Sequence, residues 1–244
     1  KVGNFKDGII EAALRMDYDY IFFVDSDLVL HPQTLNHLLW VNRDIVSEVF
    51  WTKWKPDSPE LPQVWLKDQY SLYDVRPDEN LDQYEIQRRA IQFVSNLTVP
   101  GLYQVGGLGA CTLIKRKVLE AGVRFRSIDN ISLSGEDRFF CVRARAMGFG
   151  LYADTTYPPL HLYREEELGR IEEFRARVRA GAAASQIKLL RGVSADSETG
   201  SSYTRSRFDS INRYMTLSSD IPVGWKYESP KYRFRRRAKI GRSK

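Results

Sequence analysis

The sequence lacks two features that would place it in common structural classes. It has no apolar run near the roughly 18 residues of a membrane-spanning helix, because its longest stretch, 20–30, is interrupted by Asp25 and Asp27. Its two cysteines, Cys111 and Cys141, follow no metal-binding spacing and are too few for a disulfide framework. The sequence given therefore contains no membrane-spanning helix of that kind and no disulfide-stapled scaffold, and we expect a reducing, cytoplasmic location.

Excess positive charge is absent outside one segment. Residues 226–244 hold nine of the 37 basic residues and one of the 31 acidic ones, which leaves 28 basic and 30 acidic residues elsewhere. The net charge of +6 therefore belongs to a tail, and it gives little support to a nucleic-acid-binding domain. We expect residues 227–244 to contact an anionic membrane surface peripherally, and we expect no specific nucleic-acid partner.

The composition is that of a folded domain. Hydrophobic residues make up 43% of the 244 positions, which is enough for a packed core. Apolar segments of strand length alternate with amphipathic segments up to about residue 160, and this favours an α/β fold with a mostly parallel central sheet. A helix is predicted near the start of the chain, with an inner face formed by Phe5, Ile9, Ala12, Ala13 and Met16.

The first candidate site is a pair of carboxylates at the end of a strand. Asp25 and Asp27 directly follow the apolar run 20–24, and residues i and i+2 of an extended chain point to the same side. Two hard oxygen donors on one side suit Mg²⁺ or Mn²⁺, which keeps bound water and accepts substrate phosphates. The alternative is a solvated turn in which Asp27 caps the following helix.

A second acidic pair, Glu136 and Asp137, opens a predicted helix that ends before Gly148. Acidic side chains at a helix start are also explained by capping and by the helix dipole. His161 follows the last predicted strand, and a lone histidine is often only a hydrogen-bonded structural residue.

These segments together resemble a known family. Residues 20–35 resemble the D-x-D segment of GT-A glycosyltransferases, especially glycosyltransferase family 2, and residues 4–13 resemble the helix that precedes it. The run 135–150 is similar to the E-D motif of that family. The resemblance covers about residues 1–165 and implies a GT-A, Rossmann-like nucleotide-diphospho-sugar transferase fold. The first strands of that fold would precede Lys1, so its front part is expected to be missing here.

The resemblance also implies roles for individual residues. Asp25 would contact the nucleotide sugar, and Asp27 would bind the Mn²⁺ or Mg²⁺ ion that bridges the diphosphate, with Asp25 and His161 as further ligands. Asp154 is the alternative to His161. Asp137 would be the general base that deprotonates the acceptor hydroxyl, and Glu136 would support it.

Two further segments are candidates for ligand contact. The glycine-rich stretch 105–111 precedes a strand, and the resemblance implies that Gly106 and Gly107 line the donor site. A bulge or tight turn is the alternative for these glycines. The tryptophans of the proline-rich region could stack on a sugar or a lipid-linked acceptor, or could belong to the core. They are Trp51, Trp54 and Trp65.

The resemblance thus implies a metal-dependent inverting glycosyltransferase that moves a sugar from a nucleotide-diphosphate sugar to a carbohydrate, lipid-linked or protein hydroxyl. The expected organisation is a catalytic domain over 1–164, a helical extension over 165–193, and a linker with the basic tail over 194–244. Two alternatives are a Mg²⁺-dependent phosphatase of the haloacid-dehalogenase type, in which the first aspartate is a nucleophile, and a non-enzymatic, basic-tailed binding protein.

Overall fold

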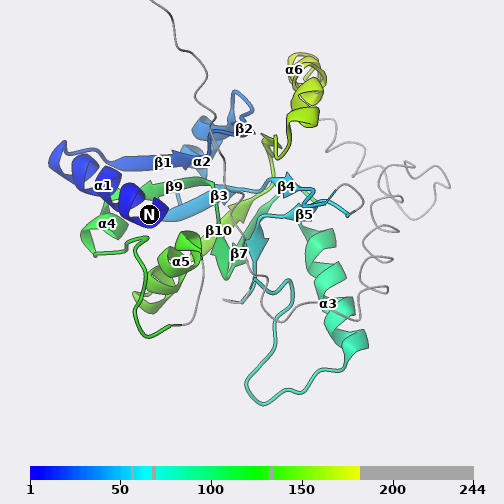
Figure 1. The fold of residues 1–244 in the computed structure, drawn as a ribbon, viewed down its shortest axis with the longest axis horizontal. Coiled ribbons are helices and arrows are strands. Elements are labelled where there is room, and N and C mark those ends of the chain that lie inside the picture. Colours follow the sequence, from blue (N-terminus) through cyan, green and yellow to red (C-terminus); the bar gives the residue numbers. More distant parts are fainter. Residues whose placement is uncertain (56–57, 68–69, 132–134, 182–244) are drawn as a thin grey trace, which may run out of the picture.

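The computed structural model describes residues 1–55, 58–67, 70–131 and 135–181. Its centre is a five-stranded sheet, accompanied by three two-stranded pairs (Figure 1). In spatial order the strands of the central sheet are β1 (Tyr20–Val24), β9 (Cys111–Lys115), β3 (Ile45–Glu48), β10 (Leu151–Asp154) and β7 (Leu102–Val105).

The central sheet is mixed, so the α/β class is confirmed but the prediction of a mostly parallel sheet is wrong. β10 pairs with β3 in parallel, whereas β9 is antiparallel to both β1 and β3, and β7 is antiparallel to β10. β1, β3 and β10 therefore run the same way, and their carboxyl ends meet at one edge beside the start of β9. A hydrophobic pattern carries no strand direction, so the reversed entry of β9 is not visible in the sequence.

Helices cover both faces of this sheet. Ile114 of β9 belongs to the core cluster that includes α1, α4 and α5, and the neighbouring Leu113 belongs to a cluster with Leu38 of α2. This alternation follows from the two-residue period of a strand. The four helices are α1 (Val2–Arg15), α4 (Arg116–Glu120), α5 (Glu136–Ala146) and α2 (Thr34–Val41).

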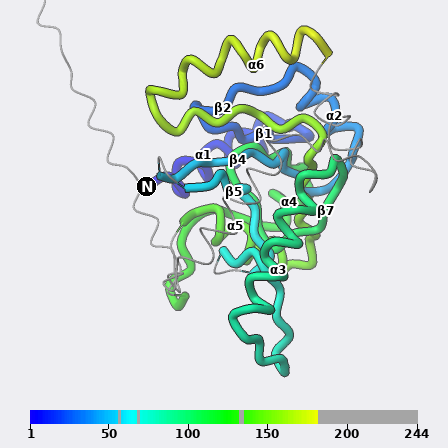
Figure 2. The backbone as a smooth tube through the Cα atoms, turned by 90° about the vertical axis from the view of Figure 1, so that its right-hand side faces the viewer, coloured from blue at the N-terminus to red at the C-terminus, as the bar shows by residue number. Residues whose placement is uncertain are grey.

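The remaining elements lie around this centre. Helices α3 (Gln83–Asn96) and α6 (Arg170–Arg179) occupy opposite ends of the molecule (Figures 1 and 2). Within the described residues, no helix has both the length and the apolarity needed to cross a membrane. The short strands are β2 (Leu28–Val29), β4 (Trp51–Thr52), β5 (Leu61–Pro62), β6 (Val64–Trp65), β8 (Gly107–Leu108) and β11 (Leu160–His161).

The buried face of α1 differs from the predicted one. Phe5, expected inside, is 70% exposed, whereas the charged side chains of Lys6 and Asp7 are buried. Asp7 is satisfied there because its carboxylate accepts a hydrogen bond of 2.7 Å from the backbone N–H of Phe125. The prediction failed because it assigned only apolar residues to the inside. The buried positions of α1 are Gly3, Lys6, Asp7, Ile10 and Ala13.

The helical extension begins with a 3₁₀ helix, η1 (Glu165–Gly169), and continues as α6. The remainder of the predicted extension, 182–193, lies outside the described residues, as do the predicted linker and basic tail, 194–244.

Candidate active site

Asp25 and Asp27 lie at the carboxyl end of β1, in a turn. The N–H of Asp25 donates to the carbonyl oxygen of Ala110 at 3.0 Å, and the N–H of Leu28 donates to the carbonyl oxygen of Asp25 at 3.2 Å. The prediction that this segment is extended is therefore wrong. The two carboxylates nevertheless interact: burial raises the pKa of Asp25, the charge of Lys6 opposes this, and the charge of Asp27 adds to it.

Pairing of β11 with β2 brings His161 next to Asp27. Nε2 of His161 lies 3.3 Å from Oδ2 of Asp27, and Nδ1 lies 2.9 Å from Oγ1 of Thr52. The hydrogen bond from His161 lowers the pKa of Asp27. The other carboxylate oxygen of Asp27, Oδ1, is buried and has no hydrogen-bond partner in the part of the chain that is described. Such an oxygen is costly unless a ligand contacts it.

The groups at this turn fit a hard divalent cation. Carboxylate oxygens and a neutral imidazole are donors that Mn²⁺ accepts, and Oδ1 of Asp27 is the atom that a cation would satisfy. Across the described residues, no group of three or more His, Cys, Asp or Glu side chains is arranged to hold a metal ion by itself. Water and substrate would therefore have to complete the coordination.

The second acidic pair, Glu136 and Asp137, lies in the first turn of α5, as predicted from the sequence. Both side chains contact a lysine from α1 that the sequence analysis missed. Nζ of Lys6 lies 2.9 Å from Oδ1 of Asp137 and 3.2 Å from Oε1 of Glu136, and its side chain is only 10% exposed. Its position in the helix could have indicated that Lys6 is buried, because it lies four residues before the apolar Ile10 and therefore on the same face of α1.

A small pocket lies beside this ion pair, between the start of β9 and the start of α5. Gly109 is part of its wall, and a Cβ atom added there would lie 3.6 Å from Oδ2 of Asp137. Burial raises the pKa of Asp137 to about 6, with repulsion from Glu136 adding to this and the attraction of Lys6 opposing it. The pocket is lined by Lys6, Phe23, Leu108, Gly109, Ala110, Thr112, Phe125, Asp137 and Phe140.

The two acidic pairs belong to one electrostatic site. The charges of Lys6 and Glu136 both act on Asp25, and the charge of Asp25 in turn acts on Asp137. Direct contacts thus join Asp27 to His161, and Glu136 and Asp137 to Lys6, whereas the interaction between these two groups is the electrostatic one through Asp25.

The glycines of the predicted donor wall have a structural explanation. β8 pairs with β6, and a Cβ atom on Gly106 would lie 1.9 Å from the carbonyl oxygen of Leu66. A Cβ atom on Gly107 would lie 2.0 Å from the indole ring of Trp65. Both glycines are therefore required for close packing inside the protein, and Gly109 is the glycine that lies beside Asp137.

The three tryptophans occupy different environments. Trp65 is buried in the core, and Trp51 packs against the same core cluster. The ring of Trp54 meets that of Tyr163 edge-on with centroids 5.2 Å apart, and the ring of Tyr163 lies 5.8 Å from that of His161. Trp54 is thus connected with the candidate metal side through Tyr163.

Asp154, the alternative to His161, belongs to a second buried cluster. Its Oδ1 lies 3.1 Å from Nε2 of His37 and accepts a 2.8 Å hydrogen bond from the backbone N–H of Thr156. Glu48, at the end of β3, is fully buried nearby, and its carboxylate accepts a hydrogen bond from the backbone N–H of Tyr157. Burial first, and the charge of Asp154 second, raise the pKa of Glu48 well above its usual range.

Comparison of the chain with protein-family models and with curated proteins found no match.

Proposed function

We propose that this chain carries the catalytic part of a metal-dependent, inverting glycosyltransferase of the GT-A type. Its substrates would be a nucleotide-diphosphate sugar and a hydroxyl acceptor. The observation that supports the proposal most is the electrostatic interaction between two acidic pairs from distant segments. One contains a buried carboxylate oxygen without a partner among the described residues, at Asp27, and the other contains a carboxylate with a pKa of about 6, at Asp137.

Asp27 would hold the cation through Oδ1, and Asp25 would supply a second carboxylate, with water and substrate completing the coordination. His161 would join them as a ligand only by exchanging its contact with Oδ2 of Asp27 for the cation. A bound Mn²⁺ or Mg²⁺ supplies positive charge that offsets the charge developing on a diphosphate leaving group. Among the protein groups, His161 fixes Oδ2 of Asp27 through its Nε2, and Thr52 fixes the opposite side of the imidazole. This leaves Oδ1 of Asp27 as the oxygen available to a ligand.

Asp137 would accept the proton of the acceptor hydroxyl. A general base works best when its pKa lies just below the working pH, because it is then ionised and still binds a proton readily. A pKa of about 6 meets this condition at neutral pH. Attack by the deprotonated oxygen opposite the leaving group is a single displacement, which inverts the anomeric centre.

The test combines two substitutions in the full protein. Asp27→Asn should weaken Mn²⁺ binding, measured by calorimetry, by at least about tenfold, since an amide is a poorer ligand than a carboxylate. Asp137→Asn should keep metal and donor binding but reduce transfer by roughly a hundredfold or more. NMR of the product from the unchanged protein should show an inverted linkage.

Asp78→Asn is the matched control, because Asp78 is an exposed aspartate in a loop and the substitution is chemically identical. It should leave binding and transfer unchanged. A retained anomeric configuration, or normal turnover with Asp137→Asn, would overturn the mechanism. Unchanged Mn²⁺ affinity with Asp27→Asn would overturn the metal assignment.

A further inference from the structure

Lys6 is a buried cation inside an acidic site. We propose that Lys6 is the positioning residue for Asp137: its ammonium group keeps the Asp137 carboxylate ionised and directs it into the pocket beside Gly109. This inference rests on the proposed function, in which Asp137 accepts the proton of the acceptor hydroxyl. It adds to that function a residue that no motif in the sequence assigns.

The structure fixes the ammonium group of Lys6 from several sides. Glu136 and Asp137 accept its hydrogen bonds at 3.2 and 2.9 Å, and the ring of Phe125 lies under it with its centroid 5.0 Å away. The next residue on α1, Asp7, binds the backbone of Phe125 and so holds that ring and the helix in register. A lysine stem that is only 10% exposed has few other rotamers available, so the charge stays at one place.

Oδ1 and Oδ2 of Asp137 have different surroundings. Oδ1 is bound to Lys6, whereas Oδ2 is the oxygen that lies near the backbone of Gly109. A monodentate ion pair of this kind restricts rotation of the carboxylate and leaves one oxygen directed toward the wall of the pocket. The resulting geometry suits a base that must approach a hydroxyl from a fixed direction.

Lys6 is also the cation that counters the acidity of this site. Burial and neighbouring carboxylates favour the protonated form of Asp137, and only Lys6 opposes them among the causes of its raised pKa. Without Lys6, Asp137 would therefore release its proton at a higher pH, and a smaller fraction of it would be ionised and able to act as a base at neutral pH. The groups whose charges interact with Asp137 are Lys6 on α1, Asp25 after β1, Glu136 and Cys141 on α5, and Tyr70 after β6.

The test measures the titration of Asp137 directly. Carboxylate ¹³C NMR of the full protein, with and without Mg²⁺, gives its midpoint in the unchanged chain and in Lys6→Met. We expect the midpoint to rise by at least about one pH unit in Lys6→Met, which corresponds to about tenfold in proton affinity. Lys6→Arg retains the positive charge, so its Asp137 midpoint should lie close to that of the unchanged chain. Lys115→Met removes another partly buried, ion-paired lysine, bound to Asp44 at 3.5 Å, and should have no effect.

A reciprocal measurement requires no change at Lys6, so it remains decisive where Lys6→Met does not fold. Burial lowers the pKa of Lys6, but the negative charges around it, with that of Asp137 the largest, outweigh burial and raise this pKa overall. Asp137→Asn should therefore lower the titration midpoint of the Lys6 ammonium group, followed by ¹⁵N NMR. An unchanged midpoint in this variant, or an unchanged Asp137 midpoint in Lys6→Met, would overturn the inference.

Activity separates this inference from the proposed function. In an active protein, Lys6→Met should shift the acid limb of the pH–rate profile for transfer to higher pH, and Lys6→Arg should shift it back. A merely structural lysine would lower the rate at every pH without moving this limb, and that result would overturn the positioning role. A shifted NMR midpoint in a protein that transfers no sugar would instead confirm the contact and overturn the proposed function.

Discussion

Glu48 shows at the residue scale how a buried carboxyl group can respond to pH. It is fully buried at the end of β3, and its Oε2 has no hydrogen-bond partner in the described part of the chain. Its other oxygen accepts a hydrogen bond from the backbone N–H of Tyr157, in the segment that leads to His161. Because burial and Asp154 raise its pKa, the folded protein retains a proton that the unfolded chain releases.

This difference predicts that Glu48 destabilises the fold as the pH rises. Above its ordinary pKa of 4.5, Glu48 is ionised in the unfolded chain but still protonated in the folded protein, so this residue lowers the free energy of unfolding by up to ~1.4 kcal/mol per pH unit until its folded pKa is reached. Glu48→Gln should remove this loss. Denaturant unfolding at several pH values should therefore show Glu48→Gln gaining stability relative to the unchanged chain as the pH rises.

The exposed Glu173 provides the control, because Glu173→Gln on α6 should leave the dependence on pH as it is. Parallel curves for Glu48→Gln and the unchanged chain would contradict the prediction.

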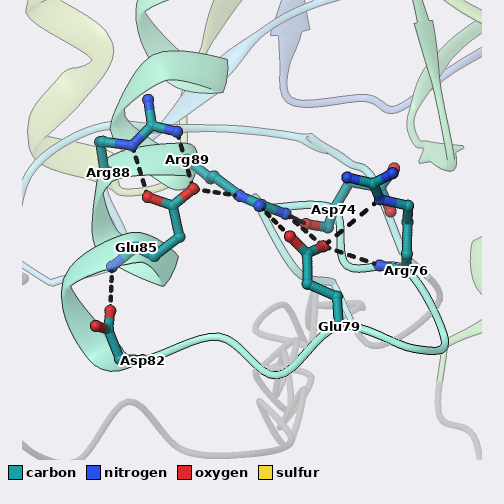
Figure 3. A network of polar contacts seen from close by, with 7 residues as sticks. All are labelled: Asp74, Arg76, Glu79, Asp82, Glu85, Arg88 and Arg89. Carbon is teal, nitrogen blue, oxygen red and sulfur yellow. Dashed lines mark hydrogen bonds and ion pairs between the residues drawn. The ribbon is translucent and has the colours of Figure 1, made fainter.

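At the element scale, ionic contacts attach a loop to helix α3. Figure 3 shows Arg89 between Glu85 of the helix and Glu79 of the preceding loop. The guanidinium group also donates to the carbonyl oxygen of Asp74 at 2.9 Å. Arg88 instead bonds to Glu85 within the helix, at 2.7 and 2.8 Å. Arg89 is therefore the residue that connects the loop to the helix.

Arg89→Ala should accordingly release the loop, and Arg88→Ala should not. Hydrogen exchange of the amides in 74–82 should accelerate by about two- to fivefold in Arg89→Ala, the scale expected for exposed ion pairs, and the difference should shrink at high salt. Hydrogen bonds from the arginines lower the pKa of Glu79 and Glu85 to about 2. The ion pairs of Glu79 and Glu85 therefore contribute fully to the stability of the loop attachment above about pH 4.5, and this contribution is lost as the pH falls toward 2. Equal exchange rates in the two variants would exclude a connecting role for Arg89.

At the scale of the whole molecule, charge is divided between the fold and the tail. The 28 basic and 30 acidic residues outside 226–244 nearly balance, and nine basic residues are concentrated within that segment. The segment lies outside the described residues, so its role follows from the sequence alone. Aromatic residues Tyr227, Tyr232 and Phe234 are interspersed with its charges, which suits a membrane interface.

Deletion of 227–244 should abolish sedimentation with vesicles that contain anionic lipid. Each basic residue near such a surface contributes roughly 1 kcal/mol, and salt screens that attraction. The full chain should therefore sediment at low salt and remain in solution at high salt, and neutral vesicles should bind neither protein. Equal sedimentation of the full and shortened chains would end this interpretation.

The sequence by itself determined the local elements and most of the candidate residues. The apolar run 20–24 forms β1, the pair Glu136 and Asp137 starts α5, and Gly148 follows its end with a φ of +84°. These features depend on the hydrophobic pattern, on helix capping and on the freedom of glycine to adopt a positive φ, all of which act over a few neighbouring residues. The carboxylates of both motifs can therefore be named from the amino-acid pattern, although their catalytic roles remain predictions.

Only the tertiary structure decided how these elements meet. It placed β9 in reverse between β1 and β3, brought His161 within 3.3 Å of Asp27, and buried Lys6 against Asp137. Each of these contacts joins segments that are far apart in the chain or depends on strand order, and the hydrophobic pattern encodes neither. Burial of a charged side chain is favourable only when another segment of the chain supplies a partner for it. The buried face of α1 could therefore not be assigned from its own residues.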